Sequence, residues 1–169
     1  MRVRTLLGLM ALAAAGALSC KSGPSPAEQA AATGRAAQYS RIAIVCAPGQ
    51  GADPSYAEPM ILQVRAMAAT RLSFLQTVDC LTGVAVDTSA VPPRVTLGEK
   101  AASYDGALAL VYTYGNGHVL LDMYLLDAKT GALAWTHRLD TKDADIRGRL
   151  LKDAYWTPTI VKQQCYGHK

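Results

Sequence analysis

Residues 105–139 read DGALALVYTYGNGHVLLDMYLLDAKTGALAWTHRL, and this stretch decides the fold. Two runs of alternating residues flank Gly115-Asn116-Gly117, which is typical of a tight hairpin turn. Asp127–Gly131 predicts a second turn. The strand after it is predicted to place four side chains on one face: Leu133, Trp135, His137 and Leu139. The stretch therefore predicts a three-stranded antiparallel meander.

The chain before the meander predicts alternating strands and helices. Tyr39–Ala47 contains a short continuous apolar run, which is typical of a strand buried on both faces. Apolar residues recur at helical spacing over Tyr56–Gln76 and predict the main helix. Three further features follow: a strand over Val78–Val86, a turn at Pro92-Pro93, and a short helix over Leu97–Ser103 that starts at the capping-box spacing of Thr96–Glu99.

After the meander, Asp143 to about Tyr155 is predicted to be helical, and Pro158 is expected to interrupt this helix. The complete order implies an α+β fold of two layers. We expect a mixed sheet of about five strands with a β-α-β opening, a C-terminal three-strand antiparallel meander, and helices packed on the sheet.

The first twenty residues predict where the protein is located. Arg2 and Arg4 precede an apolar stretch that ends in Ala17-Leu18-Ser19-Cys20, and this arrangement is typical of a secretory signal. The last four residues resemble a lipobox, although Ala17 and Leu18 exchange the usual positions of the small residue and the leucine. We predict lipidation of Cys20. An ordinary signal cut nearby and an uncleaved anchor are the alternatives.

These features predict three segments: a lipoprotein signal peptide over residues 1–19, a lipidated cysteine with a flexible tether over 20–38, and a single globular periplasmic domain over 39–169. Lys21 follows the cysteine where the enterobacterial inner-membrane signal has aspartate. We therefore predict anchoring in the outer membrane, with the domain facing the periplasm.

The charge of the chain argues against nucleic-acid binding. The formal net charge is +4, but Arg2 and Arg4 belong to the predicted signal, so the mature domain is close to neutral. Its basic residues are scattered along the sequence instead of forming a cluster. Nucleic acid is therefore not an expected partner.

Three cysteines remain beside Cys20, and an exported domain can use them in one disulfide or in none. In the predicted topology Cys46 lies at one end of the sheet. Cys80 follows the descending main helix, and Cys165 ends the last helix, which also descends. This placement favours a Cys80–Cys165 disulfide.

The sequence contains no clear catalytic or metal-binding arrangement. Cys46 with His118 or His137 is the one cysteine–histidine candidate, and no catalytic turn marks either histidine. The histidines lack ligand spacing for a metal. We expect no enzyme activity, no cofactor and no metal site. Three tyrosines of the meander are candidates for a ligand or partner surface, unless helices cover that face: Tyr112, Tyr114 and Tyr124.

Several features resemble those of known envelope proteins. They are the opening strand and long helix, Tyr104-Asp105-Gly106 before a strand, and Leu126–Gly131 between the last two strands. Over roughly residues 41–155 the chain resembles the curli-secretion lipoprotein CsgG, the amino-terminal domain of TolB, and the lipoprotein activators of penicillin-binding proteins. It also resembles small uncharacterised lipoproteins from myxobacteria. The resemblance implies a periplasmic α/β domain.

Together these observations predict a non-catalytic, lipid-anchored envelope lipoprotein that binds another cell-envelope component, which is expected to be a protein. The alternative is a lipoprotein that binds a small ligand or glycan on an aromatic sheet face. The two hypotheses differ in the partner that must be found, a protein or a small molecule.

Overall fold

The computed structural model describes residues 38–167. The predicted signal peptide, Cys20 and the tether up to residue 37 therefore lie outside the described residues. Nine regular elements follow one another: β1 (Arg41–Pro48), α2 (Ala57–Arg71), β2 (Thr77–Cys80), β3 (Ala85–Asp87), β4 (Arg94–Thr96), β5 (Gly106–Gly115), β6 (His118–Asp127), β7 (Leu133–Lys142) and α3 (Ile146–Ile160). Short 3₁₀ turns cover Pro54–Tyr56 and Gly98–Ser103, and a π-helical turn covers Val161–Cys165.

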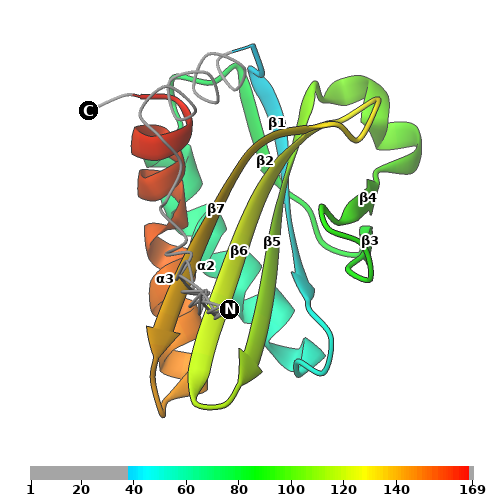
Figure 1. Cartoon of the computed structure of the whole chain (residues 1–169). Helices are drawn as coiled ribbons and strands as arrows, with labels where there is room; N and C mark the ends of the chain where they lie inside the picture. Colours follow the sequence, from blue (N-terminus) through cyan, green and yellow to red (C-terminus); the bar gives the residue numbers. More distant parts are fainter. Residues whose placement is uncertain (1–37, 168–169) are drawn as a thin grey trace, which may run out of the picture.

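The predicted fold class is confirmed. Five strands form one mixed sheet in the order β2-β1-β5-β6-β7. β1 pairs in parallel with β2 and β5, and β5, β6 and β7 pair antiparallel. In Figure 1, α2 and α3 lie together beside the sheet, while β3 and β4 form a separate small hairpin, the β3–β4 arm (residues 85–96).

The meander forms as the sequence predicts. β5 and β6 pair over ten residues, from Gly106↔Asp127 to Gly115↔His118. Asn116 and Gly117, which connect them, both have positive φ, at 53° and 77°. A two-residue turn of this kind matches the right-handed twist of its strands, and asparagine and glycine adopt it most readily. The local sequence therefore fixes the register of the hairpin.

The sheet has two differently covered faces. On one face, α2 and α3 pack over alternate residues of the strands and complete the main core: Ile42, Ile44, Leu108, Leu110, Leu121, Met123, Met60, Val64, Leu150 and Ala154. On the other face, Val86 and Val95 of the β3–β4 arm, together with Val84 just before it, cover only part of the sheet. Within residues 38–167, no helix covers the outer halves of β6 and β7 on this second face.

Asp105 joins the starts of β1 and β5. Its Oδ1 accepts hydrogen bonds from the backbone N–H groups of Ser40 and Arg41, at 3.1 and 2.8 Å. The neighbouring Tyr104 hydroxyl donates to Asp79 at 2.8 Å. Buried strand ends need such partners for their backbone groups. The Tyr104-Asp105-Gly106 motif thus has a structural role.

The strand predicted over Val78–Val86 is wrong in its extent, because the structure divides this segment. β2 ends at Cys80, and β3 belongs to the separate two-stranded sheet. Gly83, which lies between them, has φ of 70°, a conformation that glycine adopts without steric cost. The chain turns here and crosses to the other face of the sheet. β4, which pairs with β3, was not predicted.

Both predicted helix boundaries near this region also need correction. The main helix ends at Arg71 instead of Gln76. The segment after Thr96 forms a 3₁₀ turn over Gly98–Ser103, and Leu97 at its start makes no side-chain cap hydrogen bond. Thr96 belongs to β4 and pairs with Ala85. The capping-box spacing is therefore present in the sequence without forming a capping box.

The last helix continues through Pro158, against the prediction that this residue interrupts it. α3 runs to Ile160 and is extended by the π-helical turn. Proline removes one backbone donor from a helix. Here Thr157 Oγ1 donates to the carbonyl of Asp153 at 2.9 Å, and both Thr157 and Pro158 are buried. Packing against the core holds this turn in helical form.

The predicted face of β7 also differs at its first residue. Trp135 pairs with Leu125 on the helix-covered side, but a register shift between Leu125 and Leu126 pairs Leu133 with Leu126. Since neighbouring residues of a strand point to opposite faces, this bulge separates Leu133 from Trp135. Leu133 is 42% exposed and lies on the face without helices.

Candidate binding groove

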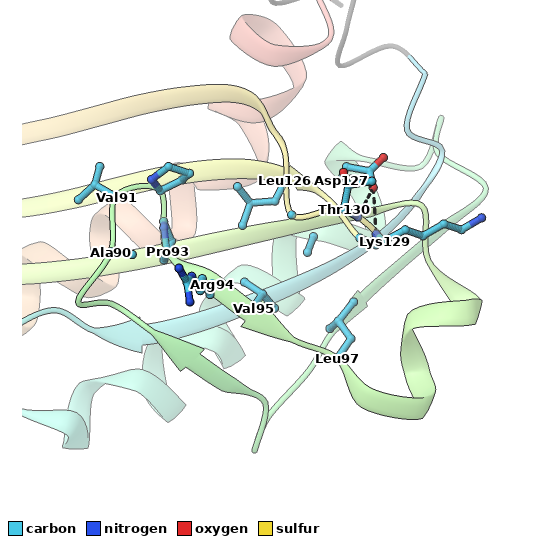
Figure 2. Close-up of a pocket in the computed structure, with 14 residues that line it drawn as sticks. Ala90, Val91, Pro93, Arg94, Val95, Leu97, Leu126, Asp127, Lys129 and Thr130 are labelled. Atoms are coloured by element: carbon cyan, nitrogen blue, oxygen red, sulfur yellow. Dashed lines mark hydrogen bonds between the residues drawn. The ribbon is translucent and has the colours of Figure 1, made fainter.

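A groove lies on the helix-free side, between the β3–β4 arm and the turn that joins β6 to β7 (Figure 2). It encloses about 510 Å³. Ala107 and Leu126 form its floor on the sheet, and Val95 and Leu97 form the wall on the arm side. Both floor residues are almost fully buried, at 2% and 1% exposure. The groove therefore has an apolar, buried floor, while charged and polar residues also line it.

The groove continues as a shallower depression of about 720 Å³ along β6 and β7. Val91 and Pro92 line both parts, which makes the two regions continuous. Val91 is 83% exposed, and Leu133 lies at the far side of the depression. An unusually exposed valine and leucine thus border one elongated surface. We call this surface, which consists of the groove and the shallower depression together, the arm groove.

The wall opposite the arm is held in place by Asp127. Its Oδ1 accepts hydrogen bonds from Lys129 N, Thr130 N and Thr130 Oγ1, at 3.0, 2.8 and 3.0 Å. The backbone hydrogen bond from Thr130 is the main cause that lowers the pKa of Asp127. In Figure 2 the Asp127 carboxylate points toward Thr130, within the turn that joins β6 to β7, while the Lys129 side chain extends outward. The Leu126–Gly131 motif therefore builds a wall of the groove.

In the part of the chain that the structure describes, one ion pair lines the arm groove. Arg138 binds Asp122 through two hydrogen bonds, at 2.5 and 2.9 Å, on the floor of the shallow part. Arg94 lies across from Asp87 in the arm. Among the described residues, neither Arg94 nor Lys129 forms an ion pair. A partner would therefore meet one ion pair in the shallow part and two cations, Arg94 and Lys129, in the deeper part.

β7 adds backbone groups to this surface. It is an edge strand of ten residues that pairs only with β6 in the described part of the chain. Its other edge presents N–H and C=O groups that another extended segment can pair with. Because Leu133, Thr136 and Arg138 of β7 line the shallow part, the edge and the arm groove form one surface.

The structure separates the three tyrosines of the predicted binding surface. Tyr112 is buried under the helices, and its hydroxyl donates to the carbonyl of Asp53 at 2.8 Å. Tyr112 and Tyr114 line a small cavity of about 170 Å³ with Ile146 and Leu150. Tyr124 lies on the opposite face of the sheet, in the floor of the arm groove, and is also buried.

The structure assembles Cys46 with neither candidate histidine. His118 begins β6, five residues before the position in register with Cys46, and its Nδ1 lies 2.8 Å from Asp140 Oδ1. Cys46, Leu110, Met123 and His137 follow one another across β1, β5, β6 and β7 in the register. Three strand spacings therefore separate the thiol from the imidazole, about 14 Å. Burial raises the pKa of Cys46 to about 12, and this disfavours the thiolate that a nucleophile requires.

Cys46, Cys80 and Cys165 are free thiols in this structure, and the latter two are buried. Burial raises the pKa of Cys80 to about 11 and also raises that of Cys165. Cys80 pairs with Ile44 in the middle of β1. The Cys80–Cys165 disulfide stays a prediction, which peptide mapping without reduction can test.

Residues 38–167 show neither a metal-ligand cluster nor a membrane-spanning helix. They contain no group of three or more His, Cys, Asp or Glu side chains placed to hold a metal ion. No helix within residues 38–167 is long and apolar enough to cross a membrane.

The fold and the arm groove define this chain as a small α+β domain with one helix-covered sheet face and one partly open face. No protein family profile matches the sequence, and no curated protein matches it. The structure is distantly similar to PelC from Paraburkholderia phytofirmans, solved as a dodecamer. This similarity has 13% sequence identity and a TM-score of 0.44, over 75% of this chain and 88% of that one.

It is also similar to lipoprotein GNA1162 from Neisseria meningitidis, with 13% identity and a TM-score of 0.39, over 71% of this chain and 96% of that one. The sequence predicts a likeness to envelope lipoproteins, and the structure has a distant resemblance to PelC and to the lipoprotein GNA1162. The more specific resemblance to CsgG, TolB and the activators of penicillin-binding proteins stays a prediction.

Proposed function

We propose that this chain is a non-catalytic, lipid-anchored envelope protein whose arm groove binds an extended segment of another envelope protein. The observation that carries the proposal is the union of a groove that has an apolar floor with the edge of β7, which pairs with no further strand within residues 38–167. Peptides that add a strand to a sheet edge use backbone hydrogen bonds for affinity and pockets beside the edge for specificity. The arm groove offers both within one surface.

The alternative, a small ligand held by aromatic residues, has less support. Tyr112 and Tyr114 line a cavity of about 170 Å³, whereas ligand pockets typically enclose about 300–1,000 Å³. The arm groove is large enough, but it is open and elongated instead of enclosed. A protein segment fits this shape better than a compact metabolite does.

The proposal can be tested by placing a photo-crosslinking amino acid at Val91 in cells. We expect a discrete crosslink to one envelope protein, mapped by mass spectrometry to an extended segment of it. Leu133→Asp should weaken this crosslink about tenfold or more, because burying a leucine contributes about 1.5–3 kcal/mol. Tyr114→Asp is the matched control, since Tyr114 and Leu133 are both 42% exposed.

Two outcomes would contradict the proposal. One is the absence of any crosslink at Val91 in the full-length protein. The other is an equal loss of the crosslink in Leu133→Asp and Tyr114→Asp, which would indicate that surface charge alone disturbs binding. A loss confined to Tyr114→Asp would favour the small cavity beside Tyr112.

The anchor is tested separately. Lipidation of Cys20 would hold the domain at the outer membrane, since two or more acyl chains anchor a protein stably. We expect Cys20→Ala to move the protein from the membrane fraction to the soluble fraction, measured by fractionation and immunoblotting. The same variant in the membrane fraction at normal yield would refute the anchor without bearing on the arm groove.

A further inference from the structure

The basic residues of the domain are concentrated in the helical layer. α2, α3 and the π-helical turn after α3 carry six Lys and Arg residues against two acidic residues, and the rest of residues 38–167 carries six against ten. One of the two acidic residues, Asp153, is buried and paired with Arg149. Glu58 is then the one exposed carboxylate of these helices. The near-neutral domain thus has one basic side.

The solvent side of α3 combines cations with aromatic rings. Tyr155 and Trp156 are 39% and 45% exposed, and their rings meet edge to face with centroids 5.2 Å apart. Lys152 lies one turn before Trp156 and is exposed, and Lys162 follows in the π-helical turn. Tryptophan and tyrosine prefer the boundary between apolar and polar phases, because each has an apolar ring and a polar tip.

The outward side of α2 is also unusually apolar for a surface helix. Its buried residues are Met60, Ile61, Val64 and Ala68. The opposite side exposes Leu62, Ala66 and Ala69, and Leu62 is 51% exposed. In Figure 1, α2 and α3 form one layer beside the sheet. The outward surface of this layer therefore joins apolar and aromatic groups with a surplus of positive charge.

From this charge and residue distribution we propose that the outward surface of α2 and α3 docks onto a membrane with anionic lipid headgroups. Cations near such a surface are attracted by its negative potential, while exposed aromatic and apolar side chains enter the interfacial region. The occupant is the bilayer, because the surplus of Lys and Arg on these helices complements anionic headgroups, and the exposed tyrosine and tryptophan suit the interfacial region. The docking surface lies on the opposite side of the sheet from the arm groove. It would leave the groove open.

The test uses the full-length protein carrying Trp135→Phe, which makes Trp156 the single tryptophan of a chain that has two. The protein is reconstituted with vesicles of phosphatidylcholine alone, or of phosphatidylcholine mixed with phosphatidylglycerol, both containing brominated lipid. We expect strong quenching of Trp156 emission only in the anionic vesicles. The quenching should be lost at 1 M salt, where the Debye length falls to about 3 Å.

Two matched double variants test the role of charge. Lys152→Gln with Lys162→Gln should lower the ratio of docked to undocked protein about thirtyfold, as expected for two cations near an anionic surface. Lys100→Gln with Lys129→Gln removes the same charge away from the helices and should leave quenching unchanged. If Trp135→Phe does not fold, the difference in quenching between wild type and Trp156→Phe gives the same measurement.

The proposal would be overturned by unquenched Trp156 in anionic vesicles at low salt. It would also be overturned by equal quenching in both vesicle types, or by equal effects of the two double variants. Because none of these readouts depends on Val91 or Leu133, their outcome is independent of the crosslinking experiment.

Discussion

Replacing Arg149 by alanine should lower the free energy of unfolding by about 3–5 kcal/mol, the cost of leaving a buried charge without its partner. The guanidinium of Arg149 contacts both carboxylate oxygens of Asp153, at 2.8 and 2.9 Å. Asp153 is 3% exposed and cannot reach water when its partner is removed. Urea denaturation of the purified protein, followed by circular dichroism, would measure the loss.

Replacing the partner residue, in Asp153→Ala, should lower the free energy of unfolding by less. The Arg149 side chain is 21% exposed, so in Asp153→Ala its guanidinium can turn toward water along its flexible stem. We expect a loss of about 1 kcal/mol. A double variant, Arg149→Met with Asp153→Leu, should remain within about 1 kcal/mol of wild type, because apolar residues often replace a buried ion pair without net loss.

The pH dependence of Arg149→Ala distinguishes a buried charge from lost packing. Burial raises the pKa of Asp153 above its ordinary value of 3.8, and Arg149 opposes this shift. A carboxyl whose folded-state pKa is raised contributes stability that is present below the unfolded pKa and is lost as the pH rises through the folded pKa. Without Arg149 the pKa rises further. The difference in the free energy of unfolding between Arg149→Ala and wild type should therefore shrink as the pH is lowered from 7 toward about 4.

A deficit that is constant with pH, or an Asp153→Ala variant less stable than Arg149→Ala, would contradict this account. The first result would indicate lost packing of the arginine stem. The second would indicate that the hydrogen bonds around the carboxylate, and not its unpaired charge, dominate the cost.

The parts of the fold that sequence reasoning predicted are those encoded by local patterns. Gly115-Asn116-Gly117 specifies its own turn, and the alternating residues beside it specify two strands with a fixed register. The parallel β1 follows from a continuous apolar run, because burial on both faces requires it. Each of these features depends on residues that are neighbours in sequence.

The features that sequence reasoning missed depend on distant contacts. β3 and β4 have three residues each and are stabilised by packing on Ala109 and Leu126, not by their own propensity. Pro158 stays helical because the core surrounds it. The bulge that turns Leu133 outward appears only in the pairing of β6 with β7. The arm groove combines all of these except Pro158, which explains why it could not be predicted.

The candidate residues show the same division. Tyr124 was predicted to share a surface with Tyr112 and Tyr114, but β5 and β6 place it on the other face. Alternation within a strand is visible in the sequence, whereas the face to which each strand turns depends on the pairing register. Val91, in contrast, carries no sequence signal, and only its 83% exposure beside the groove distinguishes it.

Leu126→Ala should detach the β3–β4 arm while leaving the five-stranded sheet intact. Leu126 is 1% exposed and belongs to the buried cluster against which Val86 and Val95 of the arm pack. Removing a buried leucine side chain costs about 2–5 kcal/mol, and a two-stranded hairpin is at best marginally stable alone. We expect amide hydrogen exchange in residues 85–96 to accelerate at least tenfold, while β5 keeps its protection relative to global unfolding.

Leu121→Ala is the matched control, since Leu121 lies on the same strand, is fully buried, and faces the helices instead of the arm. It should lower the free energy of global unfolding by a similar amount without selective exchange in the arm. Equal acceleration of the arm and the meander in Leu126→Ala would show that the arm is not a separate unit. Because Val91 is carried by the arm, a selectively detached arm should also lose the Val91 crosslink, whereas Leu121→Ala should retain it at temperatures where the protein stays folded. The stability of the arm would then control binding, which connects the packing of one leucine to the proposed function.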